Sequence, residues 1–460
     1  MRNTRIRSIV VFIVTIAFLC GLGLFVFRYI MNANTWAASS VNKYISGSEM
    51  VSAGKILDRN GVVLAESDGR RRLYNSDKDV RKAVLHTVGD ASNYISTSIQ
   101  NIYGDTLMGY NLITGFGLPQ SLKGSNSIKT TLDSELCRIA SLGLSTNKGC
   151  VMIYNYLTGE VVCMVSSPTY DPYNKPEIID SSNESYNGVY LNRCLSASFT
   201  PGSIFKIITA VSAIDNISNI ENRTFVCNGS INVDGAKVTC MSKHGKINLK
   251  DAMAKSCNIA FAELAMELGK HKMTQTANEV EFNCEHNLDK MTVAKSNYDV
   301  SQAKNVDLAW SGIGQYTDLV NPMHMMMLMG AVVNGGTCVR PYIIDSIEYS
   351  KFSMRSHMLG NSKVTLIKES TANTIRDILR YTVKNNYGDR RFPNLNVCAK
   401  TGTGEIGEGK KPNGWIIGAS LDKDCPLAFA VIVEESGFGI STAAPIATQV
   451  MSAAAKRLRK

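Results

Sequence analysis

The chain has 460 residues, 44% hydrophobic and 19% charged, which suits one large folded domain with a smaller one and excludes a disordered protein. Lys and Arg number 49 against 39 Asp and Glu, for a formal net charge of +10. The excess is spread along the chain, and no basic stripe is interleaved with aromatic residues. A nucleic-acid partner is therefore not expected.

The first uncharged stretch runs from Ser8 to Phe27, about 20 residues, which is long enough to cross a hydrocarbon core. Arginines at positions 2, 5 and 7 precede it, so the positive-inside rule holds the N-terminus in the cytoplasm. We expect a cytoplasmic tail at 1–7 and an uncleaved anchor at 8–29, with the rest outside. A cleaved signal peptide is the competing interpretation.

Residues 30–125 are expected to form a small β-containing module close to the membrane. The sequence GKILDRNGVVLAES predicts a hairpin whose turn is formed by Asp58 to Gly61. A basic cluster, Arg70 to Arg72, follows it. Two interpretations are equally consistent with this pattern, a spacer and a docking surface for a membrane partner.

Residues 126–460 are expected to form a single large domain of mixed structure. Paired antiparallel strands lie at both of its ends, with helical stretches between them, which indicates an α+β fold whose sheet is completed by the C-terminus. The run Met323 to Met329 fits a core helix. The expected strands are Val151–Tyr154, Val161–Val165, Gly414–Ala419 and Leu427–Glu434, and the expected helices are Phe205–Ile214, Ala260–Leu268 and one from about Thr442 to Arg459.

Twelve cysteines occur, but the closest are 13 residues apart in sequence. Without Cys-x-x-Cys or His-Glu-x-x-His, the sequence predicts no metal site and no cofactor. Cys227 and Cys240 bracket a Gly-rich segment and are the most suitable disulfide pair. Two free buried thiols fit the pattern equally well.

A Ser-x-x-Lys sequence at the start of a helix places both side chains on one face, so the amine can reach the hydroxyl. The pattern occurs six times here and is weak by itself. Only the copy at Ser203 follows Pro-Gly and leads into an apolar helical run, FTPGSIFKIITAVSAI, with Lys206 one turn into the helix. The commoner alternative is an N-cap serine with a surface lysine.

Two later motifs favour the catalytic interpretation. Ser256 and Asn258 flank Cys257 just before a second helix, where a hydroxyl and an amide can line a cleft; Cys257 itself is expected to be a packed small side chain. The segment 400–403, KTGT, follows a strand-like run and can offer a cation and hydroxyls to a carboxylate. Ser-x-x-Lys, Ser-x-Asn and Lys-Thr-Gly in this order are typical of penicillin-binding proteins and class A β-lactamases.

With these motifs the chain resembles a class B penicillin-binding protein, the monofunctional peptidoglycan transpeptidase, of the short kind without a large pedestal. The hairpin GKILDRNGVVLAES, the segments IKTTLDSEL and SSPTYDP, and the run HGKINLKDAMAKSCNIAFAELAMELG also resemble that family. The resemblance covers most of residues 50–450. It implies the penicillin-binding transpeptidase fold, an antiparallel sheet flanked by helices. Two departures, Tyr316 where glycine is usual and Gly404 where alanine is common, affect cleft shape rather than a reactive group.

The resemblance implies that Ser203 attacks a stem-peptide D-Ala-D-Ala and forms an acyl-enzyme, which an amine of a neighbouring strand resolves into a cross-link. It also implies that β-lactams acylate the same serine, and no metal is required. The implied roles are Lys206 as base, Ser256 as proton relay, Asn258 as a holder of the substrate amide, Lys400 with Thr401, Gly402 and Thr403 as the carboxylate site, and the backbone N–H groups of Ser203 and Thr403 as the oxyanion hole.

Three alternatives stay open from the sequence. A D,D-carboxypeptidase uses water as the acceptor, and a membrane-anchored β-lactamase hydrolyses the acyl-enzyme. In the third, the protein is chiefly a scaffold that activates a membrane glycan polymerase, a partner that the resemblance also implies for the enzyme. The sequence does not distinguish a role in division, elongation or sporulation, and it gives neither the acceptor amine nor the β-lactam sensitivity.

Overall fold

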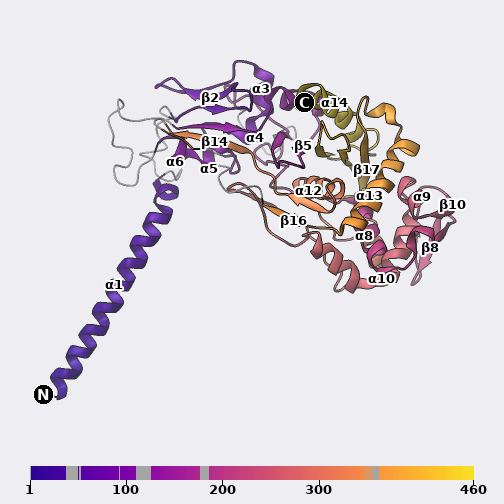
Figure 1. The fold of residues 1–460 in the computed structure, drawn as a ribbon, viewed down its shortest axis with the longest axis horizontal. Helices are drawn as coiled ribbons and strands as arrows, with labels where there is room; N and C mark the ends of the chain where they lie inside the picture. Colours follow the sequence, from indigo (N-terminus) through magenta and orange to yellow (C-terminus); the bar gives the residue numbers. More distant parts are fainter. Residues whose placement is uncertain are drawn as a thin grey trace.

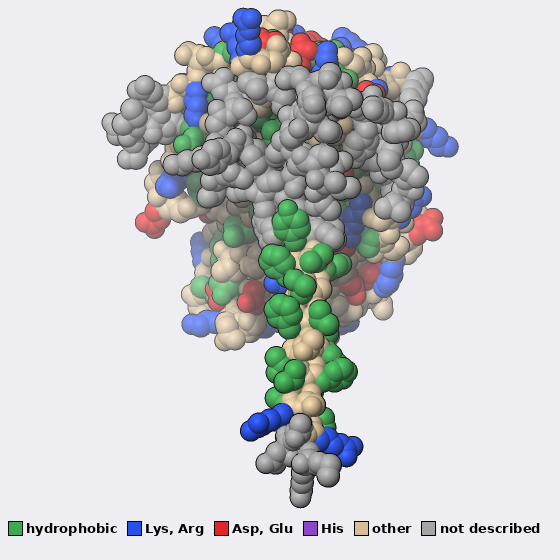
Figure 2. All heavy atoms as spheres, turned by 90° about the vertical axis from the view of Figure 1, so that its left-hand side faces the viewer, with side chains coloured by type: hydrophobic (Ala, Val, Ile, Leu, Met, Phe, Trp, Pro, Cys, Tyr) green, Lys and Arg blue, Asp and Glu red, His purple; other side chains and the backbone are tan. Residues whose placement is uncertain are grey.

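The computed structural model describes residues 2–37, 50, 53–92, 94–109, 126–176, 186–349, 352–354 and 362–459. One long helix projects from the folded part of the chain, which consists of a smaller sheet near the helix and a larger body of helices around a central sheet (Figure 1). The projecting helix, α1 (Arg2–Ala37), includes the expected anchor. Its span Arg5–Tyr29 is apolar and entirely unburied. Figure 2 shows hydrophobic side chains along both sides of the visible face of this helix and basic side chains near its N-terminal end, as a membrane anchor requires.

The central sheet of the body has five antiparallel strands in the order β17-β18-β19-β5-β6. Every residue of β18 and β19 is buried, because helices cover both faces. This confirms the predicted α+β class and a sheet that is completed by the C-terminus. The strands are β5 (Gly149–Asn155), β6 (Val161–Ser167), β17 (Val397–Gly404), β18 (Asn413–Ser420) and β19 (Leu427–Val433).

Two groups of helices pack against this sheet. One group contains α7 (Ser134–Leu144) and the C-terminal α14 (Ala443–Leu458), which contact each other and the strands. The other contains α12 (Pro322–Val333) and α13 (Glu369–Thr382), with α8 (Lys206–Asn216) beyond them. Helix α12 carries the methionine run and is buried except at its last residue, so the predicted core helix is confirmed.

A second sheet lies between the body and the anchor and has six strands in the order β15-β14-β4-β1-β2-β3. The hairpin predicted from GKILDRNGVVLAES is its β1–β2 pair. The sheet crosses residue 125, since three of its strands come from later in the chain. The domain boundary placed there stays a prediction. The strands are β1 (Ile56–Leu57), β2 (Val63–Ser67), β3 (Arg72–Tyr74), β4 (Ser127–Thr130), β14 (Ile344–Tyr349) and β15 (Phe352–Met354).

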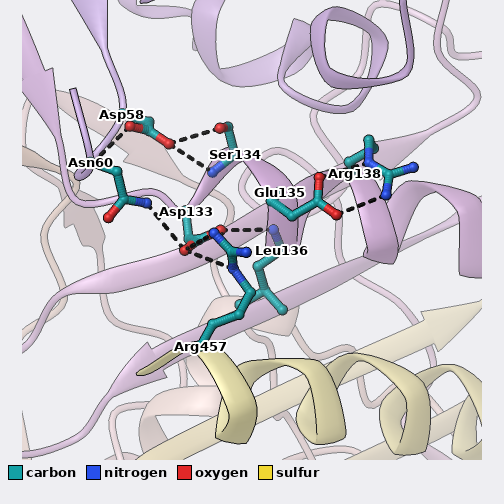
Figure 3. A network of polar contacts seen from close by, with 8 residues as sticks. All are labelled: Asp58, Asn60, Asp133, Ser134, Glu135, Leu136, Arg138 and Arg457. Carbon is teal, nitrogen blue, oxygen red and sulfur yellow. Dashed lines mark hydrogen bonds and ion pairs between the residues drawn. The ribbon is translucent and has the colours of Figure 1, made fainter. Parts of the chain in front are cut away.

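The turn of the hairpin is tied to the body by a polar network (Figure 3). The buried carboxylate of Asp58 accepts hydrogen bonds from the backbone of Asn60 at 2.8 Å and from the hydroxyl of Ser134 at 2.7 Å. Next to it, Asp133 caps α7 and accepts three hydrogen bonds from Arg457 of α14, at 2.9, 3.1 and 3.0 Å. This network, called the joint, holds the hairpin against the body, because its carboxylates are satisfied by hydrogen bonds and an opposite charge.

Arg72, which the sequence placed in a basic cluster, is buried. Its guanidinium donates to the side chain of Gln100 at 2.7 Å and to the carbonyls of Ala53 and Gly54 at 3.0 and 2.7 Å. The three arginines of the basic cluster therefore do not share one surface, because Arg72, in strand β3, points inward. Arg70 and Arg71 remain exposed.

The other elements are short or lie around the cleft. They are α3 (Lys78–Ala83), α4 (Leu85–Val88), α5 (Ile99–Ile102), α6 (Gly104–Leu107), η2 (Gly202–Ile204), η3 (Ile220–Asn222), β7 (Thr224–Cys227), β8 (Ser230–Val233), β9 (Ala236–Thr239), β10 (Gly245–Asn248), α9 (Leu249–Ala254), α10 (Asn258–Glu279), β11 (His286–Leu288), β12 (Met291–Val293), α11 (Asn305–Ser311), β13 (Thr337–Val339), β16 (Lys363–Thr365), η4 (Val383–Tyr387) and η5 (Asp389–Arg391).

Candidate active site

Ser203 lies in the short turn η2, immediately before α8. Gly202 precedes it with a φ of +54°, and a Cβ there would lie 2.1 Å from the carbonyl oxygen of Thr403. Only glycine fits this position, because the turn approaches strand β17 so closely. Pro201 and Gly202 thus place the serine turn directly against the edge strand β17. Ser203 itself remains partly exposed.

Lys206 lies on the first turn of α8 and is fully buried. Its Nζ is 3.1 Å from the hydroxyl of Ser203 and 3.1 Å from that of Ser256. It also donates to the carbonyl of Ser256 at 2.7 Å and to the side-chain oxygen of Asn258 at 2.8 Å. The Ser-x-x-Lys and Ser-x-Asn motifs therefore converge on one amine, as the sequence predicted.

Lys400 reaches the same point from strand β17. It is fully buried, and its Nζ donates to the hydroxyl of Ser256 at 3.0 Å and to the carbonyl of Thr401 at 2.9 Å. The hydroxyl of Ser256 therefore lies between Lys206 and Lys400. The sequence placed the KTGT segment after a strand, whereas the structure places all of it inside β17, whose ladder with β18 extends through Gly404.

The two lysines are buried without an acidic partner among the described residues, whose ion pairs include neither of them. Burial lowers the pKa of Lys400 to about 7. Burial, and next the positive charge of Lys400, lowers the pKa of Lys206 well below its usual value. A buried lysine that is easily deprotonated beside a serine hydroxyl has the property that a general base for that serine requires.

The remaining polar groups of the motifs face the opening of the site. Ser256, Asn258, Thr401 and Thr403 are partly exposed, while Gly402 is buried. A Cβ on Gly402 would lie 2.7 Å from the carbonyl oxygen of Pro201, so glycine allows β17 to lie against the serine turn. The hydroxyls are therefore partly exposed, while the amines of Lys206 and Lys400 are buried.

Sequence reasoning missed Tyr387, the last residue of η4. Its hydroxyl is 3.0 Å from the hydroxyl of Thr401 and accepts the Thr401 backbone N–H at 3.0 Å. Burial raises the pKa of this phenol, so it stays protonated. No motif marks Tyr387, because its contact with β17 depends on the packing of α13.

The two departures from the family pattern have local explanations. Tyr316 has a φ of +71°, the left-handed region that glycine adopts more easily, and its side chain is 44% exposed. At Gly404 a Cβ would lie 2.2 Å from the carbonyl oxygen of Thr200, so alanine does not fit this backbone. Both departures change the shape of the site and leave its reactive groups in place.

The described cysteines are free thiols. Cys227 and Cys257 are buried and Cys240 is partly buried, so the free-thiol interpretation, rather than a Cys227–Cys240 disulfide, describes this structure.

Residues 149–452 match the family described as "Penicillin binding protein transpeptidase domain", which is more than half of the chain. The chain belongs to this family. Its membership confirms the resemblance drawn from the three motifs, and with it the predicted transpeptidase function and fold.

Curated relatives carry matching names. The chain is 25% identical over 332 residues to the peptidoglycan D,D-transpeptidase PbpA of Mycolicibacterium smegmatis, with 67% of each protein covered. It is 27% identical over 437 residues to the stage V sporulation protein D of Bacillus subtilis, covering 86% of this chain and 65% of that protein.

Solved structures share the fold. A ceftriaxone acyl-enzyme complex of penicillin-binding protein A from Mycobacterium tuberculosis has a TM-score of 0.78 at 22% identity, covering 89% of this chain and 99% of the other. The D,D-transpeptidase domain of a peptidoglycan glycosyltransferase from Eggerthella lenta has a TM-score of 0.75 at 24% identity, covering 88% and 98%. At these identities the likeness concerns the fold.

Proposed function

We propose that the protein is a membrane-anchored peptidoglycan D,D-transpeptidase that works through an acyl-enzyme on Ser203. The observation that carries the proposal is the 3.1 Å separation between the hydroxyl of Ser203 and the amine of Lys206, which is buried without an acidic partner among the described ion pairs. The family and the names of the relatives support the reaction class.

In the first half-reaction, neutral Lys206 accepts the proton of Ser203 while the hydroxyl oxygen attacks the carbonyl carbon of the D-Ala-D-Ala bond. The backbone N–H groups of Ser203 and Thr403 stabilise the oxyanion that forms. The C–N bond then breaks, and Ser256, which lies between the two lysines, passes a proton to the departing D-Ala amine.

In the second half-reaction, the amine of a neighbouring stem peptide attacks the ester, and its proton returns through the same groups to the oxygen of Ser203. Asn258 holds the substrate amide, and Lys400 with Thr401 and Thr403 binds the terminal carboxylate. Tyr387 fixes the hydroxyl and the backbone of Thr401. A β-lactam, which carries a comparable acyl group and carboxylate, acylates the same serine.

We place this reaction on the outer side of the membrane. With the basic N-terminal end of α1 in the cytoplasm, the body lies outside the membrane, where its substrate is found. A membrane glycan polymerase that supplies uncross-linked strands is the partner we propose for α1 and the six-stranded sheet. Co-purification of such a polymerase with the full chain, lost when α1 is exchanged for an unrelated membrane helix, tests this partner.

The main test is the mass of the full chain after brief exposure to benzylpenicillin, followed over hours. A stable adduct on the Ser203 peptide is expected, absent in Ser203→Ala and retained in Ser301→Ala, which changes the exposed serine of another Ser-x-x-Lys sequence. An adduct that persists in Ser203→Ala contradicts the proposal. Rapid return to the free mass with hydrolysed drug indicates a β-lactamase.

The closest alternative is a D,D-carboxypeptidase, which differs in using water as the acceptor. Incubation with a pentapeptide donor and a large excess of an acceptor amine distinguishes the two. A transpeptidase gives the amine adduct as the main product, whereas a carboxypeptidase gives the hydrolysed tetrapeptide.

A further inference from the structure

Four potential metal ligands converge beside the proposed active site. They are Cys227, Cys240, His244 and Cys257, and their ligand atoms all lie within 4.8 Å of one another. Cys227 ends β7, Cys240 and His244 lie in the segment between β9 and β10, and Cys257 precedes α10. The cluster lies in the part of the body farthest from the anchor, around β8, β10 and α10 (Figure 1).

From this geometry we propose that the protein binds one Zn²⁺ ion through these three thiolates and the Nδ1 atom of His244. A tetrahedral zinc site has edges of about 3.8 Å between two sulfurs and about 3.6 Å between sulfur and nitrogen. The sulfur of Cys240 lies 3.5 Å from Nδ1 of His244. One sulfur–nitrogen pair thus already has the separation that a shared metal requires.

The donor set is that of a structural zinc site. Three Cys and one His fill the four positions of a closed tetrahedron, and neither water nor a further ligand is needed. Binding breaks three S–H bonds, forms three Zn–S bonds and one Zn–N bond, and releases three protons to solvent. Cys227 and Cys257 are buried, which protects the metal, while the partial exposure of Cys240 and His244 leaves an entry path.

Outside the membrane, where thiols can be oxidised, a disulfide is the alternative to metal binding at this cluster. Three cysteines are an odd number, so any single disulfide leaves one thiol of the cluster without a partner. His244 has no role in a disulfide, yet its ring nitrogen points at the sulfur of Cys240. The metal uses all four groups, which favours it as the occupant.

The cluster is joined directly to the Ser-x-Asn motif. Cys257 lies between Ser256 and Asn258 in the chain, and the backbone N–H of Asn258 donates to the sulfur of Cys240 at 3.3 Å. The Asn258 side chain donates to the carbonyl of Thr239 at 2.9 Å while its oxygen accepts from Lys206. Zinc would therefore act as a positioning element that holds Asn258 against Lys206, and no step of the acyl transfer passes through it.

The first test is the zinc content of the full chain, purified in detergent, loaded with Zn²⁺ and dialysed against metal-free buffer. One zinc per chain is expected, with at least a tenfold loss in Cys227→Ser. The matched control is Cys284→Ser, which changes an exposed cysteine outside the cluster and should keep its zinc. Equal zinc in both variants, or a zinc-free wild type with a disulfide among the cluster cysteines, overturns the proposal.

A second measurement needs no variant and so does not depend on whether a variant folds. Co²⁺ added to the metal-free wild type should give the intense visible bands of tetrahedral cobalt with sulfur-to-metal charge transfer in the near ultraviolet, and Zn²⁺ should abolish both. A weak octahedral spectrum would contradict a site built from thiolates.

The positioning role rests on the proposed function and has its own readout. Removal of zinc with a chelator should slow acylation by benzylpenicillin at least tenfold, and added zinc should restore it. Unchanged acylation of the metal-free protein overturns the positioning role. Absence of acylation in the zinc-loaded wild type would instead refute the proposed function, and the zinc content would still decide the metal site.

Discussion

Two polar clusters of this protein use charge in opposite ways. At the joint between the hairpin and the body, buried Asp133 is paired with Arg457, and Asp58 is satisfied by backbone and hydroxyl donors. In the cleft, Lys206 and Lys400 are buried together, with neutral oxygens as their only described hydrogen-bond partners. Paired opposite charges offset part of each other's desolvation cost, whereas two like charges in a buried site cost stability, and here the charge of Lys400 helps to lower the pKa of Lys206.

The largest effect is expected from Lys206→Met. Loss of the base should slow acylation by benzylpenicillin about 10² to 10⁴-fold. The free energy of unfolding should be unchanged or higher, because methionine carries no charge that must be desolvated. Stopped-flow acylation and chemical denaturation measure the two effects. A large loss of stability would show that this lysine also has a structural role.

The pH dependence of acylation should be bell-shaped. The rate rises as Lys206 loses its proton, since only the neutral amine accepts a proton from Ser203. It falls above about pH 7, where Lys400 loses the charge that binds the carboxylate of the drug. The second-order rate constant for benzylpenicillin, measured from about pH 5 to 10, checks both limbs. A rate that is flat across neutral pH would contradict the assignment.

Gly404→Ala tests how closely the edge strand approaches the serine turn. The new Cβ would lie 2.2 Å from the carbonyl oxygen of Thr200, so the strand must shift. We expect acylation to slow about tenfold to a hundredfold, with a loss of about 1 to 3 kcal/mol in the free energy of unfolding, because the atom in the way is a backbone oxygen. Gly104→Ala is the control, because a Cβ there would meet only the Cε atom of Met50, at 4.0 Å, and Gly104 has no positive φ. Equal acylation by both variants would contradict the close approach.

At the joint, Asp58→Ala should lower the free energy of unfolding by about 2 to 3 kcal/mol, since the donors of Ser134 and Asn60 lose a charged acceptor. Acylation by the folded protein should stay near normal. Denaturant titration measures the loss of stability, and the acylation rate shows whether the active site is affected. A selective loss of acylation would link the hairpin to the cleft.

The smallest effect is expected from Arg457→Met, a matched counterpart of Lys206→Met. Arg457 is about one-third exposed, so solvent screens its ion pair with Asp133. We expect a loss of about 1 to 2 kcal/mol in stability and no change in acylation. If both methionine variants lost equal stability, the contrast between the two clusters would be wrong.

Much of the fold and of the site could be predicted from local patterns. Apolar runs bounded by turn residues predicted the β5–β6 and β18–β19 strands, and a long uncharged run predicted the anchor. The helix α14 was predicted as well. Each of these depends on neighbours in sequence. The three motifs predicted the groups that meet at Lys206. Each motif is short, and the order of the three motifs along the chain can be read without any knowledge of contacts.

Only the tertiary structure decided what lies between distant segments. Tyr387 reaches Thr401 across the packing of a helix on a strand, and Arg72 turns into the hairpin sheet. The Cys and His residues of the cluster are separated by gaps of 13, 4 and 13 residues, and only the Cys240-x-x-x-His244 pair is local. Sequence periodicity describes one element at a time. The distance between two elements is set by packing, so the pairing of charges and the meeting of thiols appear only in the folded chain.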